Sequence, residues 1–233
     1  MPNLKSIYNA TTHLFFPHVC TGCGSDILKV DNLLCFKCIY DLTHTGYENF
    51  SNNPTEKIFI GRVPIVAATS QFYFSKGQLL QHLVHEFKYK GNKEIGLYLS
   101  KIMGEKMLAS TRFNNIDCLI PLPLFANKEY KRGFNQAAVI CDGMAMAMNI
   151  PVLKNIVTRV KFTETQTKKN RSDRWGNVEE SFSVTNTALL ENKHIMLVDD
   201  VITTGATIDA CAQKISKILG TKISIATLTV ASK

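Results

Sequence analysis

Two hydrophobic periodicities alternate along most of the chain. Four segments have apolar residues at three- and four-residue intervals and are predicted as amphipathic helices, over 79–87, 94–110, 135–149 and 206–219. Apolar, β-branched or aromatic runs predict buried strands over 116–121, 194–198 and 223–230, and one or a pair of strands over 63–74. Strands that alternate with helices predict an α/β fold, in which a mostly parallel, twisted sheet is flanked by helices.

The amino-terminal part of the chain has a different pattern. An amphipathic helix is predicted over residues 4–15, and Pro17 ends it. Paired cysteines follow, and the polar stretch 46–57 is a loop or linker by composition. We therefore predict a domain boundary near residue 55, with a helix and four-cysteine module at 1–55 and the α/β domain at 56–233.

Composition excludes two classes of protein. With 45% hydrophobic residues among 233, the chain has the composition of a packed protein and not of a disordered one. It contains no apolar stretch of the ~20 residues that cross a bilayer, and residues 1–19 lack the apolar core of a secretory signal. We therefore predict a cytoplasmic protein without a membrane span. The net charge of +8 fits either a polyanionic partner such as nucleic acid or a solvated surface.

Four cysteines form two Cys-x-x-Cys pairs that are separated by 11 residues: Cys20, Cys23, Cys35 and Cys38. Four thiolates complete the tetrahedron that zinc accepts, so the spacing predicts a structural zinc ribbon with no open position for a catalytic water. A module of this size builds little core, and metal binding would supply much of its folding free energy. A redox dithiol and an iron–sulfur cluster are the alternatives. Three further cysteines are predicted as buried apolar residues, Cys118, Cys141 and Cys211.

The segment 194–207 carries the clearest chemistry. An apolar strand ends in Asp199 and Asp200, and a turn of small residues then leads into a predicted helix. Consecutive backbone N–H groups over 203–207, at a helix amino terminus, form a cradle for a phosphate, and Gly205 allows close approach. Carboxylates accept paired hydrogen bonds from vicinal hydroxyls. The aspartate pair and the turn together indicate a site for a sugar diol next to its own phosphate. The alternative is an ordinary strand followed by a capped helix.

A second polar segment, which is basic and is predicted as a loop, follows the predicted strand 116–121. It contains Lys128, Lys131 and Arg132. Cations stabilise the negative charge of a bound phosphate, and the planar fork of arginine binds phosphate in a bidentate manner. Arg132 is therefore the first candidate for that role and Lys131 the second. A solvated turn beside an edge strand is the alternative.

The acidic segment resembles the 5-phosphoribosyl 1-pyrophosphate (PRPP) binding motif of type I phosphoribosyltransferases, in which four apolar residues precede two acidic ones and a Thr-Thr-Gly turn. The resemblance implies the type I phosphoribosyltransferase fold, with Asp199 and Asp200 on the ribose hydroxyls. It also implies that the 5′-phosphate is held by Thr203, Thr204, Gly205, Ala206 and Thr207. A leaving pyrophosphate needs cations where its negative charge develops, and the resemblance implies that role for Arg132 first and Lys131 second. Magnesium would be carried mainly by oxygens of the substrate.

A longer set of residues narrows the resemblance to the ComF family of competence-associated, phosphoribosyltransferase-like proteins. Its elements are the run from Lys131 to Gln136 and, further on, Thr163, Gln166, Arg174, Asn177, Val178 and Phe182. Lys169 departs from the leucine that is usual in the family. In related transferases the segment corresponding to 159–174 is a mobile flap that excludes water, which implies that role for Gln166, Arg171 and Arg174.

Two functions follow from these observations. The first is a PRPP-binding protein that transfers the phosphoribosyl group to an acceptor, with Asp199, Asp200 and Arg132 as its catalytic residues. The second is a non-catalytic accessory protein for DNA uptake, which binds single-stranded DNA or proteins of the competence machinery and keeps a regulatory or inert pocket. The ComF resemblance implies that both can hold together.

Overall fold

The structure, a computed structural model, describes residues 18–26, 32–75, 78–159 and 182–231, and a parallel sheet forms its centre. The sheet has the strand order β1-β6-β5-β2, and all neighbouring strands in it are parallel. Its strands are β1 (Ala67–Phe74), β2 (Cys118–Pro121), β5 (His194–Ile202) and β6 (Lys222–Ala231). The predicted parallel sheet is confirmed. The stretch 63–74 forms a single strand and not a pair.

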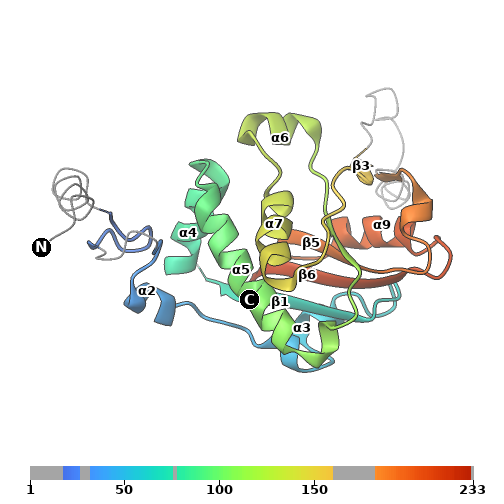
Figure 1. The fold of residues 1–233 in the computed structure, drawn as a ribbon, viewed down its shortest axis with the longest axis horizontal. Coiled ribbons are helices and arrows are strands. Elements are labelled where there is room, and N and C mark those ends of the chain that lie inside the picture. Colours follow the sequence, from blue (N-terminus) through green and yellow to red (C-terminus); the bar gives the residue numbers. More distant parts are fainter. Residues whose placement is uncertain (1–17, 27–31, 76–77, 160–181, 232–233) are drawn as a thin grey trace, which may run out of the picture.

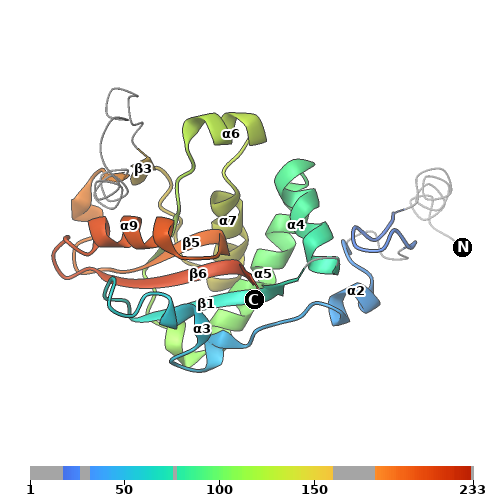
Figure 2. The same cartoon turned by 180° about the vertical axis from the view of Figure 1, so that it is seen from behind.

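Helices cover both faces of this sheet, as Figures 1 and 2 show. The four longest described helices are α4 (Leu79–Tyr89), α5 (Lys93–Ala109), α7 (Gln136–Met148) and α9 (Ala206–Ile215). In β5, Met196 and Val198 pack into the core with α4, α5 and α7, whereas Ile195 and Leu197 pack into the core with α9. Because strand residues alternate between faces, a strand covered on both sides reads as a continuous apolar run. All four predicted helices are confirmed.

The basic segment after β2 is helical, which corrects the prediction of an open loop. Residues Ala126–Arg132 form α6, and Gly133 ends it in the left-handed conformation with φ 77°. All residues of α6 are described, and none is buried. A helix without a buried face has no hydrophobic periodicity, so its sequence could not reveal it.

The polar stretch 46–57 is folded onto β1 and is not an open linker. It contains a short 3₁₀ helix, Tyr47–Asn49, and the helical turn α3, Pro54–Lys57. Asn53 is 0% exposed, caps α3 through its side chain, and donates hydrogen bonds to backbone carbonyls that include that of Ala68 in β1. The polar residues therefore satisfy buried backbone groups. The domain boundary near residue 55 stays a prediction.

The remaining described elements are short. They are α2 (Phe36–Tyr40), the 3₁₀ turns Thr111–Phe113 and Thr187–Leu189, and the antiparallel pair β3 (Val157–Arg159) and β4 (Phe182–Val184). Figure 2 shows α2 and the cysteine module beside α4, at one end of the sheet. Within the described ranges, no helix has the length and apolar character that crossing a membrane requires. The predicted helix over 4–15 lies outside the described residues.

Candidate functional site

The two adjacent aspartates lie near the carboxyl end of β5 and face opposite sides of the sheet. Strand alternation places Asp200 on the side of α4, where Lys88 Nζ lies 2.8 Å from Asp200 Oδ2. Asp199 is on the side of α9, half-buried, and one of its oxygens accepts a hydrogen bond from the backbone N–H of Asp200 at 2.8 Å. In parallel sheets, ligands bind beyond this end of the strands. Both carboxylates therefore lie at the ligand-binding end of the sheet, Asp200 on the α4 side and Asp199 on the α9 side.

Burial raises the pKa of Asp199 to about 7, and the neighbouring charge of Asp200 adds to the increase. The positive charges of Lys88 and Arg159 act in the opposite direction. A buried carboxylate with a raised pKa is favoured in its ionised form when a ligand brings hydrogen-bond donors or a cation to it. Asp199 is therefore suited to accept hydrogen bonds from hydroxyl groups, and we expect its affinity for such a ligand to increase as the pH rises toward 7.

The turn between β5 and α9 forms a small cradle next to Asp199. A cavity of about 50 Å³ is lined by Asp199 and by residues 201–208. One water requires only about 10–15 Å³ by this measure, so a larger group such as a phosphate fits. Gly205 is the amino-terminal cap of α9. The first backbone N–H groups of a helix have no acceptor within the helix, so those of α9 are suited to donate hydrogen bonds to an anion in this cavity. The predicted phosphate-binding residues and Asp199 thus line one cavity, whereas Asp200 lies beside it.

The segment after α3 supports this turn from outside. Arg62 Nη1 donates a hydrogen bond to the carbonyl oxygen of Thr204 at 2.8 Å, and the buried ring of Phe59 packs near Gly205. Gly205 has φ 73°, and a Cβ added there would lie 2.6 Å from Cγ2 of Ile58. Both the backbone conformation and the close packing require glycine at this position.

We expect Gly205→Ala to lower the free energy of unfolding by about 2–4 kcal/mol, because left-handed strain and overpacking add. Gly133→Ala is the matched control, since Gly133 has φ 77° but an added Cβ would meet nothing within 4 Å, and strain alone costs about 1–2 kcal/mol. Urea unfolding of both variants measures the difference. Equal losses would show that packing on Ile58 does not constrain the turn.

The two predicted pyrophosphate-binding cations lie in the last turn of α6. Arg132 is half-buried, donates a hydrogen bond to Gln136 Oε1 at 2.8 Å, and lies over the ring of Tyr89 with 5.7 Å between the guanidinium carbon and the ring centroid. Lys131 is exposed. Tyr89 follows Lys88 in α4, so this helix contacts both Asp200 and the basic segment.

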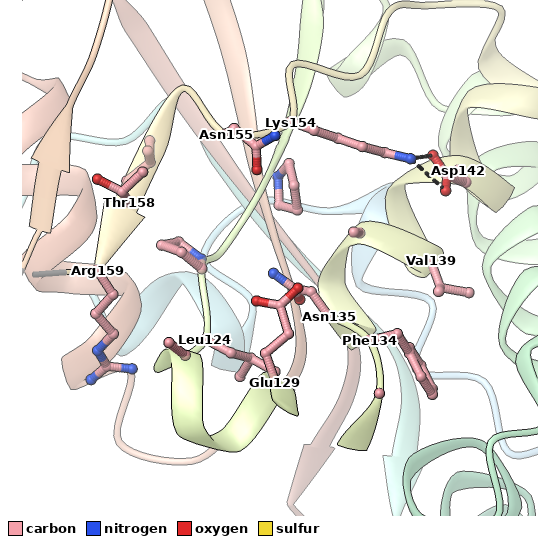
Figure 3. A pocket seen from close by; sticks show the side chains of 16 residues that line it. Leu124, Glu129, Phe134, Asn135, Val139, Asp142, Lys154, Asn155, Thr158 and Arg159 are labelled. Atoms are coloured by element: carbon pink, nitrogen blue, oxygen red, sulfur yellow. Dashed lines mark hydrogen bonds and ion pairs between the residues drawn. The ribbon is translucent and has the colours of Figure 1, made fainter. Parts of the chain in front are cut away.

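A larger cavity, of about 550 Å³, lies beside the chain that leaves β2 (Figure 3). The ion pair between Asp142 and Lys154, with a closest distance of 2.7 Å, lines one side, and Arg159 lines the other. The Arg159 guanidinium carbon lies 3.7 Å from the centroid of the Phe125 ring, and burial lowers the pKa of Arg159. An arginine held against an aromatic ring, and close enough to Asp199 to influence its pKa, can bind an anion at this edge of the site.

The sequence analysis missed Lys88 and Arg62, and it included Arg159 only as the first residue of the predicted flap, 159–174. Lys88 follows Val84 by four residues, so it borders the buried stripe of α4, where a lysine stem packs and its charged end reaches out. This position beside the buried stripe could have indicated from the sequence that Lys88 reaches past the core. The other three predicted flap residues, Gln166, Arg171 and Arg174, lie outside the described residues.

The four predicted zinc ligands lie together. Their sulfur atoms are all within 4.8 Å of one another, and Sγ of Cys23 is 3.7 Å from Sγ of Cys35. Tetrahedral zinc with bonds of ~2.3 Å separates its sulfur ligands by ~3.8 Å, so the cluster fits such an ion. The hydroxyl of Ser25 lowers the pKa of Cys23 to about 6, which favours the thiolate that binds metal. The three other cysteines are buried, as predicted.

The cysteine module packs directly on α4. Cys20 and Cys38 share a hydrophobic core with Leu80 and Leu83 of that helix. The approach is close, because a Cβ added to Gly22 would lie 2.7 Å from Leu79 Cδ1. His82 Nε2 also lies 3.0 Å from the carbonyl oxygen of Thr21. One helix therefore connects the cysteine cluster with the acidic end of the sheet.

Comparison with known proteins finds a family match in the carboxyl-terminal part of the chain. Residues 132–233 match the phosphoribosyl transferase domain family. This segment contains β5, the turn to α9, β6 and the predicted cation Arg132. With its parallel sheet flanked by helices, the chain has the type I phosphoribosyltransferase fold.

Relatives among characterised proteins narrow the assignment. The chain is 32% identical over 146 residues to competence protein F of Haemophilus influenzae, which covers 60% of this chain and 62% of that protein. It is 26% identical over 198 residues to the DNA utilization protein YhgH of Escherichia coli K12, covering 84% and 82%. The competence protein ComFC of Bacillus subtilis is 24% identical over 204 residues, covering 84% and 76%. These relatives confirm the resemblance to the ComF family. The chain spans less than two thirds of the length of the Haemophilus relative.

Proposed function

We propose that the protein binds PRPP and transfers its phosphoribosyl group to an acceptor nucleophile, with release of pyrophosphate. One observation carries the proposal: Asp199 and the turn at 203–207 line the same phosphate-sized cavity at the carboxyl end of a parallel strand. A carboxylate beside a ring of backbone N–H groups complements a molecule that has hydroxyls and a phosphate on one sugar.

In this mechanism the chain positions the sugar and stabilises charge. The N–H groups of 203–207 hold the 5′-phosphate, and Asp199 and Asp200 accept hydrogen bonds from the ribose hydroxyls. As the acceptor bonds to C1′, the bond from C1′ to the pyrophosphate oxygen breaks, and its electron pair leaves with the pyrophosphate. Arg132, Lys131 and Arg159 supply positive charge on the side where that charge develops.

Two metal ions belong to the proposal. Zinc at the four cysteines would be structural, since protein sulfurs fill all four positions of its tetrahedron. Magnesium would be carried mainly by oxygens of the PRPP diphosphate and would keep several waters. The ligands are thiolates for zinc and diphosphate oxygens for magnesium, and each kind of ligand suits its ion.

The relatives' names, together with the net charge of +8, support a link to DNA uptake in natural competence. We propose a cytoplasmic protein that works on or beside single-stranded DNA together with competence proteins. The alternative is a non-catalytic DNA-binding accessory protein whose PRPP pocket is regulatory or inert, and the same two observations favour it.

Pyrophosphate release tests the transfer step. Protein, PRPP and Mg²⁺ are incubated with free bases, amines or ends of nucleic acids, and pyrophosphate is measured with a coupled assay. We expect release that depends on one class of acceptor and is lost in Asp199→Asn. Bound PRPP without release for any class would contradict transfer and leave the accessory function.

A gel-shift assay tests the DNA link. Single-stranded DNA should be retarded at low salt, and the logarithm of the binding constant should fall linearly with the logarithm of the salt concentration, because neutralised phosphates release counterions. No retardation at low salt would remove DNA binding from the proposal.

A further inference from the structure

Lys88 of helix α4 contacts the acidic end of β5. Lys88 Nζ is 2.8 Å from Asp200 Oδ2, and the two side chains are only 12% and 11% exposed. Lys90, two residues further on, pairs instead with Glu86 at 2.7 Å and is 60% exposed. Of these two neighbouring lysines, one therefore belongs to the site and the other to the surface.

Contacts at both ends of α4 fix the position of Lys88. At its amino end, Leu79 and Leu80 pack against the cysteine module. At its carboxyl end, the Phe87 ring lies 5.6 Å from the Phe134 ring, measured between centroids, and Tyr89 lies under Arg132. A lysine side chain is flexible, but here its backbone is held by packing on either side. The ion pair with Asp200 is thus built into the fold.

The aspartate pair requires such a cation. Adjacent carboxylates repel, and desolvation further disfavours the ionised form of Asp199, whose pKa is raised. The groups that face the pair from the surrounding elements are Lys88 of α4, Arg159 of β3 and Cys211 of α9, whose thiol pKa burial raises. Lys88 is the one in direct contact with a carboxylate.

We propose that Lys88 is a positioning residue: its ion pair orients the Asp200 carboxylate and its positive charge offsets the repulsion between the two aspartates, so that both side chains accept hydrogen bonds from the ribose hydroxyls. This inference rests on the proposed function. A largely desolvated ion pair contributes little net stability, so its main consequences are the direction in which the Asp200 carboxylate points and the positive charge that Lys88 places near Asp199.

The test measures PRPP affinity by calorimetry from pH 6 to 9 with Mg²⁺. We expect the wild-type affinity to rise about fivefold from pH 6 to pH 7 and to level off above about pH 8, because binding requires ionised Asp199, whose pKa is about 7. Lys88→Met should bind at least tenfold more weakly at pH 7, with its midpoint about one pH unit higher. Lys88→Arg should restore the midpoint, and the control Lys90→Met should match wild type.

The outcomes separate the two proposals. Wild-type protein that binds no PRPP overturns the proposed function itself. If wild type binds and folded Lys88→Met has the same affinity and midpoint, the role of Lys88 is overturned while the proposed function stands. Should Lys88→Met fail to fold, Lys88→Gln keeps a hydrogen-bond donor without the charge, and the same rise in midpoint is expected; an unchanged midpoint there also overturns the inference.

Discussion

Replacing Asp199 and Asp200 together by Asn is expected to abolish the thermal stabilisation of the protein by PRPP. Asn keeps the size of the side chain but removes the negative charge that strengthens hydrogen bonds from ribose hydroxyls. A hydrogen bond to a charged group contributes about 1.5–3 kcal/mol, so losing two should weaken binding by at least about 100-fold. A melting curve at rising PRPP concentrations in Mg²⁺ measures this effect.

Asp117→Asn is the matched control for that variant. Asp117 precedes β2, at the opposite end of the sheet, where it accepts a hydrogen bond from the backbone N–H of His194 at 2.7 Å. Its replacement removes one carboxylate, as each substitution in the pair does, but leaves the proposed site intact. We expect this control to retain the full ligand-induced shift. A double variant that melts like wild type at every PRPP concentration would remove the aspartates from ligand binding.

Loss of metal from the cysteine cluster should unfold the module around it. Cys20, Leu34 and Cys38 are buried in a core that the module shares with α4, and the module's own apolar residues are few. Structural zinc contributes apparent binding free energies of about 10–16 kcal/mol in small modules, which is folding free energy for a site that forms only in the folded state. We expect chelation to expose residues 18–26 and 32–42, and to increase hydrogen exchange in α4.

Cys23→Ser tests the cluster without opening the core. Cys23 is exposed, so serine there removes a ligand but little packing, whereas Cys141→Ser alters a buried cysteine of α7 that is no ligand. Elemental analysis should find one zinc per chain in wild type and in Cys141→Ser, and much less in Cys23→Ser. Purified protein with iron or with a disulfide at these cysteines would instead support one of the alternatives to zinc.

Sequence patterns predicted the elements that bury an apolar face. Helix α7 and strand β5 fill the cores on either side of the sheet, and burial of this kind forces a period of 3.6 or a continuous apolar run. Helix α6 has no buried residue, and residues 46–57 are held by side-chain hydrogen bonds such as those of Asn53. An exposed helix and a segment held by side-chain hydrogen bonds both lack a periodic hydrophobic pattern. This is why α6 and residues 46–57 were predicted as loops.

The candidate site likewise has a part that the sequence predicted and a part that it did not. Asp199 and the turn at 203–207 are contiguous in the chain, so a local motif could predict that they lie together. Arg62 contacts Thr204 across 142 positions, and Lys88 reaches Asp200 from another helix. Such contacts depend on how the helices dock on the sheet, which the spacing of residues within one segment does not encode.

Titration calorimetry of the wild-type, metal-loaded protein with PRPP and Mg²⁺ at pH 8 measures whether the site at the end of β5 binds PRPP. We expect one binding site per chain, weaker binding of ribose 5-phosphate, which lacks the pyrophosphate, and no measurable binding of ribose, which lacks both anionic groups. Folded protein that gives no binding heat with PRPP at any temperature of the titration would contradict the proposed binding of PRPP.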